Sequence, residues 1–272
     1  MNYNQAPKLE FNYKKIKCLI MKEMTTSINL SETFLKACDE NDLQKVRACL
    51  ELGVDVNTKD KYNAGLHYAA SNNNIELCEI LLSQHGIDVN QVNSDGQTAL
   101  MVSCLNEREE ITQKLVSHPG IDFNCQDRDG FTAAYYAVDS GNIGCVKILS
   151  MQNNVNWNLF PPNRQTITAL AIERNNQEIL RMLINISSIN WNLRGGDEHS
   201  ALTLALKSGK TDCIKILFTV PTLEIDIDHL KRLGVYEAAI DACQQHFIEK
   251  MGGANKELVK LLNSVNKPEC PV

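Results

Sequence analysis

An asparagine recurs along this chain at a fixed interval of 34 residues. The positions concerned are Asn90, Asn124, Asn158 and Asn192. A second marker keeps the same spacing at Thr98, Thr132, Thr166 and Ser200, and Ala64 precedes it by one period. Fixed periods of this size are typical of stacked structural repeats. We therefore expect a repeat array rather than a single globular core.

Within one period, the residue pattern predicts two short helices and a loop. Between residues 64 and 90 the chain reads AGLHYAASNNNIELCEILLSQHGIDVN. Ala69 and Ala70 give the first helix small side chains, and the polar stretch SNNN ends it. Leu77 and Leu81 then recur at helical spacing in the second helix. Neither helix can bury its apolar face alone, so the unit is expected to be stable only in a stack.

This unit resembles the ankyrin repeat, whose usual length is about 33 residues and whose start reads T-P-L-H-x-A. The corresponding segments here are GQTALMVSC, GFTAAYYAV, RQTITALAI and EHSALTLAL, while LELGVDVN, GIDVN and GIDFN close a repeat. The resemblance covers about residues 31–226. It implies an all-α fold, an ankyrin-repeat solenoid of stacked helix-turn-helix units with short β-hairpin fingers. The usual proline is replaced throughout and the usual histidine remains only as His67, so uneven stability along the array is expected.

The same reading divides the chain into four segments. They are a flexible leader (1–28), an ankyrin repeat array of six units (29–228), a C-terminal helical capping unit (229–264) and a flexible tail (265–272). The first unit, FLKACDENDLQKVRACLELG, carries charges where an internal repeat is apolar, which is typical of a cap. In the capping unit we expect a longer first helix, a break at Gly252-Gly253 and a final helix.

The resemblance also implies roles for the loop residues. The repeating asparagine is expected to bond the loop backbone through its side chain before the chain enters a finger, as Asn readily does. Asn90 is the first candidate for hydroxylation by an asparaginyl hydroxylase. The residue before each asparagine is expected to pack beneath the helices; these residues are Val56, Val89, Phe123, Trp157 and Trp191.

Composition restricts the classes of partner. A formal net charge of −6 and a pI near 5.6 argue against a general affinity for nucleic acid or anionic membranes. No apolar run approaches the roughly 18 residues that a membrane span needs, and the N-terminus lacks a signal-peptide pattern. We expect a soluble monomer in the cytoplasm, with the nucleus as a second compartment. Cys78, Cys145 and Cys213 lie in apolar helix stripes and are expected to be reduced core thiols.

One short string suggests chemistry, but its position favours a structural role. GGDEH, from Gly195 to His199, is similar to the signature of diguanylate cyclases. Here it falls in the fifth finger, in phase with NSDGQ and DRDGF, and short motifs outside their structural context are mostly chance. Phosphate-loop, HExxH and CxxC motifs are absent and the histidines are scattered. We expect no catalytic residue, no cofactor and no metal site, and hence no enzyme.

Function is therefore expected from the surface. Solenoids present an extended concave face, which in the ankyrin family is built from finger tips and the outward ends of the first helices. Carried over position by position, the candidate partner-binding residues are Arg128, Phe131, Asp139, Phe160, Asn163, Glu173, Arg174, Arg194 and His199. The same carry-over places Gln165 and Asp197 on the fourth and fifth fingers. The predicted function is an interaction module or adaptor for a protein partner.

An alternative reading rests on the last residues, NKPECPV. With one more cysteine, Cys270-Pro271-Val272 would complete a Cys-Pro-x-Cys knuckle that resembles the start of a RING-type zinc finger. Such a site needs further ligands downstream. Under this reading the array is the substrate-recruiting part of a truncated RING-type E3 ubiquitin ligase.

Overall fold

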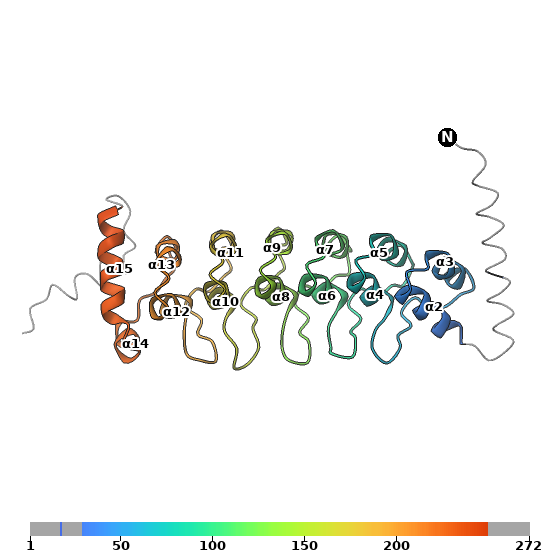
Figure 1. Ribbon diagram of the computed structural model, residues 1–272, viewed down its shortest axis with the longest axis horizontal. Helices are drawn as coiled ribbons and strands as arrows, with labels where there is room; N and C mark the ends of the chain where they lie inside the picture. Colours follow the sequence, from blue (N-terminus) through green and yellow to red (C-terminus); the bar gives the residue numbers. More distant parts are fainter. Residues whose placement is uncertain (1–16, 18–28, 250–272) are drawn as a thin grey trace, which may run out of the picture. The chain divides into compact units, whose positions relative to one another are not determined.

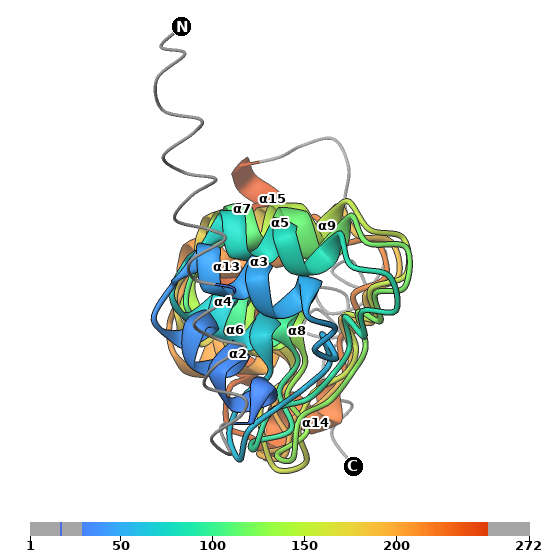
Figure 2. The same cartoon turned by 90° about the vertical axis from the view of Figure 1, so that its right-hand side faces the viewer.

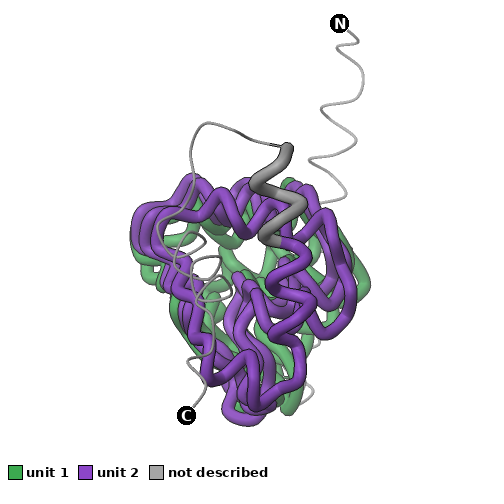
Figure 3. The backbone as a smooth tube through the Cα atoms, turned by 90° about the vertical axis from the view of Figure 1, so that its left-hand side faces the viewer, with its two compact units in different colours: residues 1–128 green, residues 129–272 purple. Residues whose placement is uncertain are grey.

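The computed structural model describes residue 17 and residues 29–249, with residues 243–249 described by their backbone only. The chain divides into two compact units, residues 1–128 and 129–272 (Figure 3). The expected leader, the Gly252-Gly253 break, the final helix and the tail with Cys270 lie outside the described residues, apart from residue 17 in the leader.

The first unit consists of three helix pairs in two layers. They are α2 (Leu30–Asp39) with α3 (Leu43–Glu51), α4 (Gly65–Ser71) with α5 (Ile75–Leu82), and α6 (Ala99–Leu105) with α7 (Glu109–Val116). Helices α2, α4 and α6 form one layer and α3, α5 and α7 the other (Figures 1 and 2). Contacts run within each pair and between neighbours of a layer, so every pair packs on the next.

The second unit continues the pattern and ends differently. Its pairs are α8 (Ala133–Ser140) with α9 (Ile143–Ser150), α10 (Ile167–Glu173) with α11 (Gln177–Leu183), and α12 (Ala201–Lys207) with α13 (Thr211–Leu217). Two further helices follow, α14 (Ile227–Arg232) and α15 (Tyr236–Glu249). The six predicted helix pairs are present in the described residues, and the all-α repeat fold is confirmed.

The repeating Thr or Ser begins the first helix of each unit. The side-chain oxygen of Thr98 accepts a hydrogen bond from the backbone N–H of Met101 at 3.3 Å. Thr132, Thr166 and Ser200 make the same contact with the residue three positions later. This N-cap satisfies a backbone donor that the helix leaves unpaired. Ala64 has no such oxygen, and there the His67 ring Nδ1 accepts from the Ala64 N–H instead.

Most of the predicted core positions are buried, whereas Phe123 is half-buried. Leu81 and Leu149 are fully enclosed, and Trp157 and Trp191 are only 3% and 2% exposed, which confirms their packing role. Cys78, Cys145 and Cys213 are buried free thiols, as expected. Burial raises the pKa of Cys78 to about 12, so this thiol stays protonated and packs as a small apolar group.

Helix α14 lies where the 34-residue phase would place a sixth finger, and the sequence did not predict it. Asp226, one period after Asn192, caps this helix by accepting a hydrogen bond from the N–H of His229 at 3.0 Å. The longer helix expected next is α15, 14 residues in length, which packs on α12, α13 and α14. The predicted boundary at 228/229 falls within α14, and the division into array and cap remains a prediction.

Candidate partner-binding groove

Within each unit, repeating asparagines hold one loop to the loop of the following repeat. In the first unit, Asn57 Nδ2 donates to Gly86 O at 2.8 Å and its Oδ1 accepts from the Asp88 N–H at 2.7 Å. In the second unit, Asn158 Nδ2 donates to Ser188 O at 2.8 Å and its Oδ1 accepts from the Asn190 N–H at 2.7 Å. The expected loop contact is therefore present, and it joins two repeats rather than stabilising one loop.

Neighbouring fingers also bond to one another directly. The backbone N–H of Ser94 donates to Tyr62 O, and that of Gly196 donates to Arg164 O, each at 2.8 Å. The described fingers contain only two isolated antiparallel bridges, Lys59 with Ala64 and Val92 with Thr98, so the β-hairpins are minimal. Backbone contacts between fingers thus set their spacing.

These contacts explain the glycines of the GGDEH string. A Cβ atom on Gly196 would lie 2.2 Å from the Cα of Asn163, and one on Gly195 would lie 2.8 Å from Arg164 O. Only glycine permits the fifth finger to approach the fourth this closely. The string is part of a finger, in the phase that the sequence predicted for it.

A groove of about 510 Å³ opens in the second unit, against α8 and α10 and the fingers that precede α8, α10 and α12. It combines aromatic, charged and amide side chains. The lining residues are Phe131, Tyr135, Asp139, Asn163, Arg164, Gln165, Leu170, Glu173, Arg174 and Asp197. Ligand-binding sites are usually concave, with a few polar groups that fix the orientation of the ligand.

Aromatic rings form one wall of the groove. The Phe131 ring centroid lies 5.0 Å from that of Tyr135, and the Arg164 guanidinium carbon lies 5.7 Å from the Phe131 ring centroid. This separation is within the range of cation–π attraction. Tyr135 is only 4% exposed, and burial, followed by the nearby Asp139 carboxylate, raises its pKa to about 12. Its hydroxyl therefore remains protonated and can donate a hydrogen bond.

An ion pair joins α8 to α10 at the edge of the groove. Arg174 Nη2 lies 2.6 Å from Asp139 Oδ1, with the two side chains 53% and 36% exposed. The hydrogen bond to Asp139 raises the pKa of the Arg174 guanidinium. Exposed pairs of this kind contribute about 0–1 kcal/mol to stability. The pair thus removes one charge of each sign from the groove without contributing much to the fold.

Five of the nine predicted partner-binding residues line this groove. They are Phe131, Asp139, Asn163, Glu173 and Arg174. Phe160 is half-buried outside the lining, and Arg128 is an exposed residue of the first unit. Two more lining residues, Gln165 and Asp197, lie at finger positions that the sequence assigned to the concave face. The sequence-based prediction missed Tyr135, Arg164 and Leu170, of which Tyr135 carried a signal in the aromatic run FTAAYY beside Phe131.

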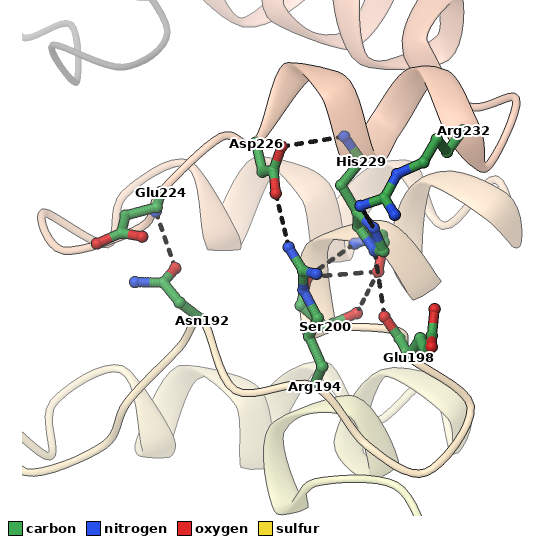
Figure 4. A network of polar contacts seen from close by, with 9 residues as sticks. Asn192, Arg194, Glu198, Ser200, Glu224, Asp226, His229 and Arg232 are labelled. Carbon is green, nitrogen blue, oxygen red and sulfur yellow. Dashed lines mark hydrogen bonds and ion pairs between the residues drawn. The ribbon is translucent and has the colours of Figure 1, made fainter.

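Arg194 instead joins the fifth finger to α14 (Figure 4). Its Nη2 lies 2.7 Å from Asp226 Oδ2. In the same network, His229 Nε2 donates to Glu198 O at 3.1 Å, and Asn192 Oδ1 accepts from the Glu224 N–H at 2.9 Å. The network surrounds a small cavity of about 90 Å³. These contacts fix the end of the array, with Arg194 already paired.

His199 is buried, contrary to the exposed position that the sequence suggested. The exposed fraction of His199 is only 6%. The Lys207 ammonium lies 3.0 Å from its Nε2, which accepts the hydrogen bond, while Nδ1 has no partner among the described residues. This ring is turned inward toward Lys207, the last residue of α12, so His199 is not available on the surface of the finger.

Two further features are absent from the described part of the chain. Groups of three or more His, Cys, Asp or Glu side chains arranged to hold a metal ion are absent from residues 17 and 29–249. None of the helices from α2 to α15 combines the length and apolar composition that crossing a bilayer requires.

Stacked helix pairs, loops joined by side chains and an open groove together define a helical-repeat interaction module. The chain belongs to the ankyrin repeat family: the family profile "Ankyrin repeats (3 copies)" matches residues 9–93 and 66–160. Ankyrin repeat proteins bind protein partners, and the family is typically a non-enzymatic scaffold.

Known proteins share parts of this array. The putative ankyrin repeat protein YahD of Escherichia coli is 34% identical over 79 residues, 29% of this chain and 39% of YahD. The probable E3 ubiquitin-protein ligase XBOS32 of Oryza sativa is 38% identical over 76 residues, 27% of this chain and 15% of the ligase. The chain thus spans well under half the length of either relative.

Solved structures share the fold over a longer stretch. The ankyrin repeat protein EF0377 matches with a TM-score of 0.64 and 25% identity, covering 70% of this chain and 98% of that one. The ankyrin repeat domain of Bcl-3, described as a member of the IkappaB family, matches with a TM-score of 0.62 and 19% identity, covering 71% and 88%. The Bcl-3 match shows the fold alone.

Proposed function

We propose that this protein is an adaptor that binds a protein partner in the groove of its second unit. The observation that carries the proposal is the concentration of five predicted binding residues in one 510 Å³ groove with an aromatic wall. Aromatic and arginine side chains are the types that most often carry binding energy at interfaces. Phe131, Arg164 and Arg174 supply both types.

The scaffold suits this role because the groove is built from elements with fixed spacing. The asparagine hydrogen bonds between neighbouring loops, and the hydrogen bond from the Gly196 N–H to Arg164 O, hold the fingers in place. A preformed groove loses less entropy when a partner binds than a flexible loop does. We propose a monomer of the cytoplasm, with the nucleus as a second compartment; sedimentation and fluorescence imaging of the full chain test these two points.

The experiment is affinity capture with the full chain, followed by identification of captured proteins and measurement of their dissociation constants. Phe131→Ala with Phe160→Ala is expected to weaken the main partner by more than about 2 kcal/mol. Because only Phe131 lines the groove, Phe131→Ala alone should account for most of the loss. Tyr62→Ala is the matched control, since Tyr62 is a 57% exposed aromatic on a finger of the first unit.

Two results decide the proposal. A partner that is lost with Phe131→Ala and retained with Tyr62→Ala supports the groove as the binding surface. Unchanged affinity of every partner for Phe131→Ala, with an unchanged circular dichroism spectrum, removes the groove from consideration.

A second candidate is favoured by the similarity to the rice protein XBOS32, a probable E3 ubiquitin-protein ligase. In this reading the array recruits the substrate of a RING-type ligase. Transcript sequence beyond Val272 tests it: paired Cys and His codons at zinc-ligand spacing support the ligase, and an in-frame stop without them contradicts it.

A further inference from the structure

The groove offers more unpaired negative than positive charge. Three carboxylates line it, Asp139, Glu173 and Asp197, against two guanidinium groups, Arg164 and Arg174. Arg174 is bound to Asp139 at 2.6 Å, so these two charges largely cancel. The Glu173 carboxylate makes no hydrogen bond or ion pair with any described residue. A partner group entering here meets an excess of carboxylate oxygens.

The guanidinium of Arg164 indicates which kind of group binds the aromatic wall of the groove. The Arg164 group lies over the Phe131 ring at 5.7 Å, and both residues line the groove. A flat cation is attracted to the negative face of an aromatic ring, and arginine makes such contacts more often than lysine. The chain therefore places its own exposed arginine on this ring in the absence of a partner.

A second, independent observation is a hydrogen-bond acceptor in the groove lining that has no donor. Gln165 Oε1 is enclosed and has no hydrogen-bond partner among the described residues. Gln165 lines the groove beside Arg164. Buried acceptors without a partner are rare in folded proteins and each needs an explanation. A group with several N–H donors, entering the groove, would satisfy this oxygen.

From these observations, and resting on the proposed function, we infer that the groove receives an arginine side chain of the partner, displacing Arg164 from the Phe131 ring. The partner's guanidinium stacks on Phe131, pairs with Glu173 and presents N–H donors toward Gln165. An acidic partner segment is disfavoured, since it would meet three carboxylates and only one guanidinium, that of Arg164, which is not already bound to a carboxylate.

Small probes test this chemistry directly on the full chain. Aromatic carbon–proton NMR signals of Phe131 and Tyr135 are followed while N-acetyl-arginine amide, N-acetyl-citrulline amide or N-acetyl-glutamate amide is added. Citrulline has the shape of arginine without its charge. The arginine probe should give saturable shifts and bind about tenfold more tightly than the citrulline probe, as loss of a charge-assisted contact implies.

Two variants should change the affinity for the arginine probe in opposite directions, which a purely structural role of these residues would not produce. Glu173→Gln should weaken the arginine probe several-fold. Arg164→Ala should tighten it several-fold, because the internal competitor and its positive charge are removed together. Arg181→Ala, which removes an exposed arginine outside the groove, should leave the binding unchanged.

The inference is overturned by any of four results: no saturable shift with the arginine probe, equal binding of the citrulline probe, tighter binding of the glutamate probe, or weaker binding in Arg164→Ala. These results are independent of the affinity capture. If capture depends on Phe131 while the glutamate probe binds more tightly, the groove function stands and only the arginine assignment fails. If the arginine probe binds but no partner depends on Phe131, the proposed function fails instead.

Discussion

Asn90 reaches across the repeat boundary to Gly120, with its Nδ2 2.8 Å from the Gly120 carbonyl oxygen. The other end of the same amide accepts from the N–H of Asp122 at 2.8 Å. One side chain thus satisfies a donor and an acceptor of the next loop. The period-34 asparagine therefore contributes to the coupling between neighbouring repeats on which solenoid stability depends.

Loss of this bridge should destabilise the first unit. Asn90→Ala removes two hydrogen bonds, each worth about 0.5–1.5 kcal/mol, so a loss of about 1–3 kcal/mol in the free energy of unfolding is expected. Hydrogen exchange should rise at the amide of Asp122, whose acceptor is removed. Asn153→Ala is the control, because Asn153 is exposed and is not one of the repeating loop asparagines. Equal effects of the two variants would mean that the asparagine contacts between loops do not couple the repeats.

Hydroxylation of Asn90 stays a prediction, and the structure adds a condition to it. Both ends of the Asn90 side chain are engaged with the next repeat, so the loop must open before an asparaginyl hydroxylase can reach it. Leu81→Ala, which creates a cavity in the same unit, should therefore be hydroxylated faster than the wild type. Mass spectrometry after incubation with the enzyme measures the added oxygen; its absence in both proteins would contradict the prediction.

Core damage should spread locally before it spreads through the chain. Leu149 is fully buried in α9, and Leu→Ala at such a site costs about 2–5 kcal/mol. In Leu149→Ala, hydrogen exchange should rise first in α8, α9 and α11, because α9 packs on the other two. Leu105→Ala, at a 42% exposed leucine, serves as the matched control. A uniform rise from one end of the chain to the other would argue against repeat-by-repeat stability.

Acid should destabilise the first unit through His67. Burial lowers the pKa of this ring below its ordinary value of 6.5. The unfolded chain therefore takes up a proton that the folded chain does not, so stability is fully present above about pH 6.5 and is lost as the pH falls toward the folded-state pKa. In His67→Gln, the slope of unfolding free energy between about pH 7 and 5 should be smaller. An unchanged slope in urea titrations would exclude His67 as the cause.

The fifth finger should not tolerate a side chain at Gly196. The added Cβ would lie 2.2 Å from the Cα of Asn163, so the two fingers must separate, and overpacking of this kind typically costs about 1–3 kcal/mol. Thermal unfolding of Gly196→Ala should show this loss, with faster exchange of the residue-196 amide. Gly120→Ala is the control, since its Cβ would meet only the His118 ring at 3.5 Å. Similar stability of the two variants would disprove the role of close finger packing.

Local patterns were sufficient to predict much of this protein. The period of 34, the helix pairs, the buried Leu81 and Leu149 and the enclosed tryptophans all follow from which residues recur at helical spacing, because a repeated apolar face can be buried only against its neighbour. The phase of the repeat also identified GGDEH as part of a finger, and five residues of the groove by their place in the unit.

Which groups meet across repeats follows from the packed structure and not from the sequence pattern. The partners of Asn90 and Arg174 lie 30 and 35 residues away in sequence, and several polar residues at similar distances could have served equally well. Helix α14, which packs on α15, lies where the phase of the repeat would place a finger. His199 turns inward, where its ring contacts Lys207 of α12. Sequence period fixes which face of each helix is buried; the packed geometry of neighbouring repeats selects the side-chain pairs, since distances of a few ångströms decide each hydrogen bond.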